Sequence, residues 1–316
     1  PWRGRGNRQA DAILVARIMT AFTLAAAQYP IDQLANWSAY AAKLTDWVAA
    51  AAQGGAQLAL FPEYGAMEFA ALCPATMGDL AGSLAHVASL AGQIDALHAD
   101  LACAHGLHIL AASTPVRLAS GAYVNRARLF TPTGQMGWQD KQVMTRFEAE
   151  HWGISPGASL RLFDTALGRI GIAICYDSEF PLIARALVEA GAGLILVPSC
   201  TDTAHGYWRV RLGCQARAVE GQCYIAQSPT VGEAPWSPAV DVNVGAAGLF
   251  APPDGTFPAD GVVAMGAMNA AQWVFGKVDL ALVEQLRGDG AVLNHRDWMA
   301  QPGVHALPCV DVVELR

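Results

Sequence analysis

The sequence has few charged residues, no long apolar run and no excess of positive charge. Charged residues make up 15% of its 316 positions and apolar residues 53%, a composition that forms a core and excludes intrinsic disorder. No uninterrupted apolar run approaches the roughly 18 residues needed to cross a bilayer. Acidic residues outnumber basic residues by 27 to 20, and the formal charge of −7 disfavours nucleic acid and anionic membrane surfaces as partners.

Cysteine is too sparse for a disulfide framework. Seven cysteines lie between Cys73 and Cys309, an odd number in a long chain, which favours a reducing compartment. The first residues lack the charged-then-apolar order of a signal peptide. We therefore expect a soluble, cytoplasmic protein. Residues 1–17, which begin with a basic and glycine-rich stretch, are interpreted as a flexible leader.

Strand-like runs alternate with helical patterns from Met19 onward, which is the order that builds a layered α/β domain. We find no internal repeat and no low-complexity linker, so residues 18–287 are predicted to form one domain. The tail at 288–316 has no assignable pattern. Strands are expected at 20–27, 57–61, 107–112, 168–174, 194–198 and 222–227, with a hairpin at 123–138. Helices are expected at 34–53, 77–103, 181–190 and 207–221.

Three of the predicted strands are followed closely by a reactive side chain. Glu63 follows the run at 57–61, Lys141 follows the second half of the hairpin, and Cys175 follows the run at 168–174. In α/β sheets the loops after the strand ends converge on a ligand crevice. Together these positions supply a base, a cation and a nucleophile.

These three side chains suit acyl transfer without histidine. The thiol of Cys175 needs a neighbouring base or cation, because a thiol is mostly protonated at neutral pH. Glu63 can take that proton and return it to a departing amine. Lys141 can hold the oxyanion of a tetrahedral intermediate, helped by the backbone N–H of Tyr176.

The motifs that carry these residues resemble those of the nitrilase superfamily, the carbon–nitrogen hydrolases, in their order along the chain. They read Phe-Pro-Glu-Tyr at 61–64, Asp-Lys at 140–141 and Cys-Tyr-Asp-Ser-Glu-Phe-Pro at 175–181. The resemblance covers roughly residues 18–280. It implies an α/β fold with a four-layer αββα sandwich, a Glu-Lys-Cys triad, a thioester intermediate and no cofactor. It also implies a homodimer or larger homo-oligomer that associates through a helical face.

The resemblance also implies a second glutamate after the lysine that positions the substrate. Glu148 and Glu150 are the two candidates, and we favour Glu148 because it follows Phe147. Tyr64 and Tyr176, which lie in the first and third motifs, are expected to line the substrate site.

The residues after the nucleophile favour an amide substrate over a nitrile. True nitrilases tend to show Cys-Trp-Glu there, whereas Cys-Tyr-Asp at 175–177 resembles the amidase-type members. Glu179 stands where related dicarboxylate-monoamide hydrolases have an arginine, so we expect a neutral or amine-bearing acyl group. The predicted function is hydrolysis of a linear carboxamide to an acid and ammonia through a thioester on Cys175.

Other interpretations stay open at this point. The same triad serves a nitrilase or an N-carbamoyl amidase, and a scaffold without catalysis is a further alternative. No metal site is expected, because the Cys-x-His-x-x-His cluster at 103–108 lacks a fourth ligand. Four polar or aromatic residues after the strand at 194–198 either line the pocket or form a subunit contact: Asp202, His205, Tyr207 and Trp208.

Overall fold

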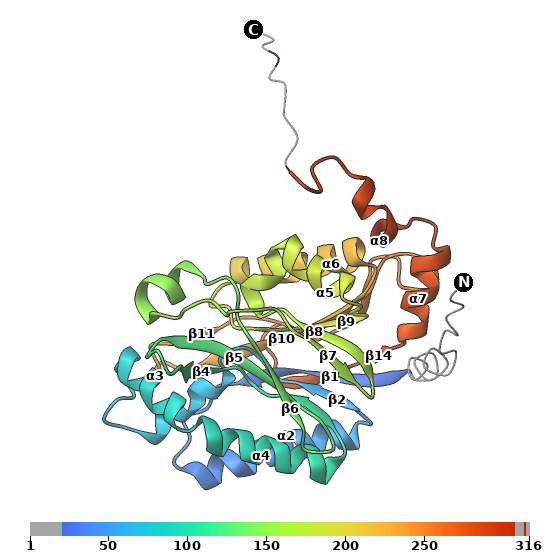
Figure 1. The fold of residues 1–316 in the computed structure, drawn as a ribbon. Coiled ribbons are helices and arrows are strands. Elements are labelled where there is room, and N and C mark those ends of the chain that lie inside the picture. Colours follow the sequence, from blue (N-terminus) through green and yellow to red (C-terminus); the bar gives the residue numbers. More distant parts are fainter. Residues whose placement is uncertain (1–20, 307–312, 314–316) are drawn as a thin grey trace, which may run out of the picture.

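Two β-sheets pack face to face, and helices cover the outer face of each, which gives four layers (Figure 1). The structure, a computed structural model, describes residues 21–306 and 313. The leader predicted at 1–17 and part of the tail at 288–316 lie outside the described residues. The predicted αββα sandwich is confirmed.

The first sheet contains seven strands, and β1 pairs with β2 in parallel and with β14 in antiparallel orientation. Its strands are β1 (Phe22–Pro30), β2 (Leu58–Leu60), β3 (His108–Leu110), β4 (Thr114–Arg117), β5 (Tyr123–Phe130), β6 (Met136–Asp140) and β14 (Gln272–Val278). Helices cover its outer face, and they are α2 (Trp37–Gln53), α3 (Leu80–Ser89) and α4 (Ala91–His105).

The second sheet is built around the parallel strands β8, β9 and β10. Its strands are β7 (Leu162–Thr165), β8 (Gly168–Ile172), β9 (Leu194–Ser199), β10 (Tyr224–Glu233), β11 (Val242–Asn243), β12 (Gly248–Phe250) and β13 (Val262–Met265). Helices α5 (Pro181–Glu189) and α6 (Ala204–Gly221) cover it. The two sheets join at one end, where β1 pairs with β10 through Tyr29 and Thr230.

The alternation of side chains along β1 explains the layers. Leu24 and Ala26 pack into the core that includes the second sheet, whereas Ala25 and Ala27 pack with the buried side of α2. Every one of these four side chains is buried. Both faces of the strand are therefore apolar, as expected for a central strand covered on each side.

Six short or terminal helices complete the described part of the chain, and four of them are not α-helices. These four are the 3₁₀ helices η1 (Gly65–Leu72), η3 (Cys175–Glu179) and η4 (Trp298–Ala300), with the π-helical turn η2 (Glu148–Trp152). Helices α7 (Leu280–Asp289) and α8 (Asn294–Asp297) follow the last strand. Helix α7 therefore crosses the boundary at 287 that the sequence suggests, and residues without a recognisable pattern form α8.

The structure departs from the predicted elements at several places. The helix expected at 77–103 is two helices that meet at Leu90, beside Gly92 and a Ser89 hydroxyl that donates to a backbone carbonyl. Strands β4 and β7 were not predicted, because each is only four residues long. In the described ranges, no helix has both the length and the apolar character required to cross a membrane.

Candidate active site

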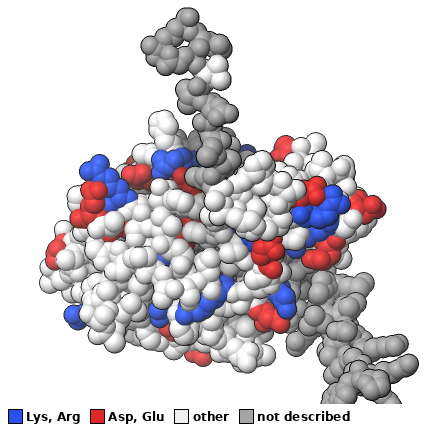
Figure 2. Space-filling model, turned by 45° about the horizontal axis from the view of Figure 1, so that its top comes forward, with Lys and Arg blue, Asp and Glu red and all other residues white. Residues whose placement is uncertain are grey.

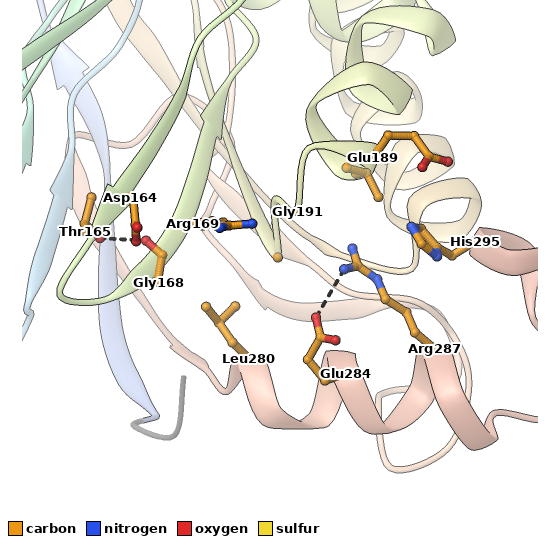
Figure 3. Close-up of a pocket in the computed structure, with 12 residues that line it drawn as sticks. Asp164, Thr165, Gly168, Arg169, Glu189, Gly191, Leu280, Glu284, Arg287 and His295 are labelled. Carbon is orange, nitrogen blue, oxygen red and sulfur yellow. Dashed lines mark hydrogen bonds and ion pairs between the residues drawn. The ribbon is translucent and has the colours of Figure 1, made fainter. Parts of the chain in front are cut away.

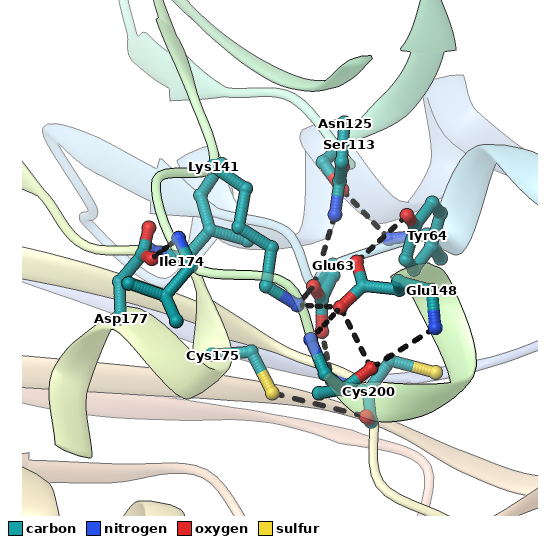
Figure 4. A network of polar contacts seen from close by, with 12 residues as sticks. Glu63, Tyr64, Ser113, Asn125, Lys141, Glu148, Ile174, Cys175, Asp177 and Cys200 are labelled. Carbon is teal, nitrogen blue, oxygen red and sulfur yellow. Dashed lines mark hydrogen bonds and ion pairs between the residues drawn. The ribbon is translucent and has the colours of Figure 1, made fainter. Parts of the chain in front are cut away.

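The three reactive side chains predicted from the strand ends line one cavity of about 500 Å³ (Figure 4). Glu63 lies in the loop after β2, and Lys141 directly follows β6, so both come from the first sheet. Cys175 begins η3 after β8 and comes from the second sheet. The cavity therefore lies where the strand ends of the two sheets meet.

Lys141 lies between two carboxylates. Its Nζ is 2.7 Å from Oε1 of Glu63 and 2.6 Å from Oε2 of Glu148. The lysine side chain is only 1% exposed. Burial disfavours the ammonium, but the two carboxylates outweigh burial and hold the pKa of Lys141 well above its usual value. Lys141 is therefore charged at neutral pH.

Glu63 accepts hydrogen bonds from three donors. Besides Lys141, the Nδ2 of Asn125 donates to Oε1 at 2.9 Å, and the backbone N–H of Cys200 donates to Oε2 at 3.0 Å. Burial raises the pKa of Glu63 to about 7, against the effect of Lys141 and together with that of Glu148. A carboxyl with a pKa near neutrality both accepts and returns a proton readily.

Cys175 is buried beside Glu63 and has a strained backbone. Its φ of +49° lies in the left-handed region, which a non-glycine residue adopts only when its surroundings hold it there. Its Sγ lies 3.8 Å from the backbone oxygen of Cys200. Burial and the nearby Glu63 raise the pKa of the thiol well above its usual value. Cys175 is therefore a thiol at neutral pH and requires a base to react.

The structure separates the two candidates for the second glutamate. Glu148 is buried in η2, and its Oε1 accepts the Tyr64 hydroxyl at 2.9 Å. Its Oε2 accepts both the N–H and the hydroxyl of Thr145 as well as Lys141. Burial raises its pKa, but Lys141 and Thr145 outweigh this and lower it. Glu150 is exposed, pairs with the exposed Arg146 at 2.8 Å and does not line the cavity.

The three other residues predicted to contact the substrate all line the cavity, but their polar groups have different partners. Tyr64 and Tyr176 both line it, and the Tyr64 hydroxyl is already engaged by Glu148. Glu179 also lines it, but its carboxylate lies 3.5 Å from Nε of Arg209, which lines the same cavity. The carboxylate that was expected to repel an anionic substrate is therefore partly neutralised.

Of the four residues after β9 that sequence left open, Asp202 alone lines this cavity. Tyr207 is buried in α6, and Trp208 is exposed.

Two polar residues of the site were missed. Asn125 is a buried amide in β5, and no sequence signal set it apart, because the same strand also carries Arg126 and Arg128. Asp177 stands in the third motif, and it accepts backbone N–H groups from both sides of the site: Gln142 at 3.1 Å, Val143 at 2.8 Å and Ile174 at 3.2 Å. Asp177 thereby connects the segment after Lys141 with the segment before Cys175.

A second cavity of about 390 Å³ lies beside α7, away from the three reactive residues (Figure 3). Arg287 lines it, and the guanidinium donates to the backbone oxygens of Gln222, Ala192 and Gly221 and pairs with Glu284. Its hydrogen bonds hold α7 against the body of the protein. In the described part of the chain, no three His, Cys, Asp or Glu side chains are arranged to hold a metal ion.

Comparison with known proteins places this geometry in a family. The carbon–nitrogen hydrolase family model matches residues 23–277. A probable hydrolase of Bacillus subtilis, YhcX, is 34% identical over 270 residues, which are 85% of this chain and 52% of that protein. The chain thus spans about half the length of this relative. An omega-amidase of Xenopus laevis, NIT2-B, is 27% identical over 190 residues, 56% of this chain and 63% of that protein.

Solved structures share the fold at low sequence identity. A carbon–nitrogen hydrolase from Helicobacter pylori G27 superimposes with a TM-score of 0.68 at 16% identity, covering 85% of this chain and 92% of that chain. An amidase from Nesterenkonia sp. gives 0.64 at 22% identity, covering 88% and 96%. With the family match, these findings show that the chain belongs to the carbon–nitrogen hydrolase family.

Proposed function

We propose that this hydrolase is a cysteine amidase that converts a linear carboxamide to a carboxylic acid and ammonia. The observation that carries the proposal is the set of contacts at one cavity: a thiol beside a carboxyl whose pKa is about 7, with a buried ammonium between two carboxylates. The names of relatives support it, since an omega-amidase and deaminated glutathione amidases are among them.

The first half of the reaction forms a thioester. Glu63 takes the proton of Cys175 while the sulfur attacks the amide carbon, and the carbonyl π electrons move to oxygen. Lys141 and the backbone N–H of Tyr176 stabilise this oxyanion. When the carbon–nitrogen bond breaks, Glu63 returns the proton to the nitrogen, and ammonia leaves.

The second half hydrolyses the thioester. Water attacks the carbonyl carbon as Glu63 accepts one of its protons, and the carbon–sulfur bond breaks. The proton returns to sulfur, so the free thiol is restored and the carboxylic acid departs. Glu148, which binds Lys141 and Tyr64, keeps the ammonium in place to stabilise the oxyanion.

The cavity favours a neutral acyl group. Its wall contains the apolar side chains of Phe147, Val210 and Val242 beside the Glu179–Arg209 pair. The pair carries one negative and one positive charge. A charged group at the end of the acyl chain would therefore meet a like charge as well as an opposite one, whichever its sign.

Mass spectrometry of the protein after incubation with a panel of amides tests the proposal. We expect an acyl adduct on Cys175 and release of ammonia. Cys175→Ala should lower kcat/KM by at least about a thousandfold and abolish the adduct. Cys214→Ala is the matched control, because Cys214 is a buried cysteine of α6 outside the cavity, and it should retain activity.

Two results would contradict the amidase proposal. Ammonia released only from nitriles or only from ureido compounds would assign the triad to a nitrilase or an N-carbamoyl amidase. Full turnover by Cys175→Ala would remove the thioester from the mechanism.

A further inference from the structure

Asn125 contacts two members of the reactive group. The residue is fully buried in β5. Its Nδ2 donates to Oε1 of Glu63 at 2.9 Å, and its backbone oxygen accepts the N–H of Lys141 at 2.9 Å. Figure 4 shows the amide directed at the Glu63 carboxylate from the side of the first sheet. One residue thus holds both the carboxylate and the chain position that carries the ammonium.

We propose that Asn125 is a positioning residue for acid–base catalysis, which fixes the Glu63 carboxylate and favours its ionised form. The inference rests on the proposed role of Glu63 as the base that accepts the thiol proton.

The pattern of contacts on Glu63 supports this role. Oε1 accepts from both Lys141 and Asn125, whereas Oε2 accepts from the backbone N–H of Cys200. A carboxylate oxygen accepts two hydrogen bonds, so Oε2 keeps one position for the proton of Cys175. Three donors on two oxygens fix the plane of the carboxylate in that orientation.

Asn125 also distinguishes the two carboxylates that share Lys141. The ammonium contacts Glu63 and Glu148 alike, so it favours ionisation of both. The amide of Asn125 donates to Glu63 and not to Glu148. Asn125 therefore favours ionisation of Glu63, the base, and leaves the contact between Lys141 and Glu148 unchanged.

The buried amide of Asn125 lowers the stability of the folded state, and packing alone does not explain why an amide is present. In the described residues, the Oδ1 of Asn125 is buried without a hydrogen-bond partner. A buried acceptor without a partner destabilises the folded state, and an apolar side chain of the same shape would avoid that cost. The donor on the same side chain explains why an amide occupies this position.

The titration of Glu63 depends on the ionisable groups that face it from each neighbouring element. These groups are Lys141 after β6, Glu148 of η2, Cys175 of η3, Cys200 after β9 and Tyr64 before η1.

The test is the pH dependence of kcat/KM in wild type, Asn125→Leu and Asn125→Ala. Wild type should lose activity tenfold per pH unit below about 7, because Glu63 becomes protonated there. This fall in kcat/KM at low pH is the acid limb of the profile. Loss of the Asn125 donor should shift the acid limb to higher pH by about one unit. At about pH 6 the variants should then lose roughly tenfold more activity than at alkaline pH.

Val124→Ala is the matched control. Val124 is buried next to Asn125 in β5, and its truncation lowers stability without removing a donor to Glu63. It should keep the wild-type acid limb. Leucine has nearly the shape of asparagine, so Asn125→Leu should fold, with a melting temperature somewhat below that of wild type because the buried Glu63 loses one donor.

A second measurement separates this proposal from the proposed function. The rate at which iodoacetamide alkylates Cys175, followed by peptide mass spectrometry across pH, reports the base without turnover. If wild type hydrolyses no carboxamide, the amidase proposal fails, and the alkylation profile still tests Asn125. An acid limb in folded Asn125→Leu that coincides with wild type in both measurements would overturn the inference.

Discussion

At the scale of single residues, Lys141 sets the charge balance of the site. The ammonium lies between Glu63 and Glu148, with one carboxylate on either side. When the proton moves from Cys175 to Glu63, the negative charge moves from one buried group to its neighbour. The transfer creates no new net charge in a buried site, where an unpaired charge is costly. The charged Lys141 therefore faces one negative charge from the Glu63–Cys175 pair both before and after the proton transfer.

Glu179 and Arg209 should set the preference for the acyl group. Glu179→Ala leaves the Arg209 guanidinium without its partner at the cavity, so kcat/KM for a ω-carboxylated amide should rise by severalfold relative to its neutral analogue. The change is modest because Arg209 is 60% exposed. Steady-state kinetics with matched amides measures it.

Arg209→Ala is the reciprocal variant. It leaves Glu179 unpaired and should shift the preference towards a ω-amino amide. An identical preference in wild type and both variants would show that the pair does not contact the acyl group.

Sequence pointed to Glu63, Lys141, Cys175 and Glu148, which line one cavity, but not to Asn125, which contacts Glu63, or to Asp177, which accepts a backbone N–H next to Lys141. Glu63, Lys141 and Cys175 stand in motifs near strand ends, where the chain pattern points to them. Asn125 lies inside a strand, and nothing in its neighbours indicates that it reaches a residue 62 positions away. A hydrogen bond between distant segments depends on strand register, which periodicity does not fix.

At the scale of elements, Asp177 fastens two loops together. Its carboxylate is 1% exposed and accepts backbone N–H groups from the loop after β6 and from the segment that leads into η3. Burial raises its pKa to about 6, against the effect of the Val143 N–H and of Lys141. Asp177 therefore contributes directly to the spacing between the ammonium of Lys141 and the thiol of Cys175.

Asp177→Asn should weaken both stability and catalysis. Its amide nitrogen cannot accept a hydrogen bond, so buried N–H groups lose a partner, and the free energy of unfolding should fall by about 2–4 kcal/mol. A shift of about 1 Å between the loops should lower kcat/KM roughly a hundredfold. Urea denaturation and steady-state kinetics measure the two effects.

Asp95→Asn is the control for loss of a partly buried carboxylate. Asp95 pairs with Arg128 at 3.1 Å and does not contact the cavity. It should affect stability and leave kcat/KM near the wild-type value. Wild-type kcat/KM in Asp177→Asn would show that the loops keep their spacing without the carboxylate.

The elements that sequence failed to predict share a physical reason. The helix break at Leu90 lies in a stretch whose apolar spacing is compatible with one continuous helix, so periodicity alone cannot place it. The four residues of β4 become a strand through pairing with β5. Tertiary pairing, which is absent from a local pattern, decides such short elements.

At the scale of the whole molecule, the two sheets supply different parts of the site. The first sheet carries Glu63 and Lys141, and the second carries Cys175. The packed layers between them, and the pairing of β1 with β10, keep these groups together. The layered fold implied by the family resemblance is therefore also what brings the reactive residues within reach.

Helices α5 and α6, which cover the second sheet, carry exposed apolar side chains on the surface of the molecule. Figure 2 brings this side forward and shows a broad uncharged area between clusters of charged residues. Leu182 of α5 is 71% exposed, and Leu212 of α6 is 58% exposed. Exposed apolar side chains that cluster on one face favour association with a partner. We propose that two copies of the chain associate through α5 and α6.

Leu212→Glu should convert this dimer to a monomer, because a buried charge without a partner at the contact is strongly unfavourable. Size-exclusion chromatography with light scattering should give twice the mass of one chain for wild type and the mass of one chain for Leu212→Glu. Met136→Glu is the matched control, since Met136 is 42% exposed on β6 of the first sheet, and it should remain dimeric. A wild-type protein that elutes as a monomer at high concentration, or a Leu212→Glu protein that keeps the double mass, would place the contact elsewhere or remove it.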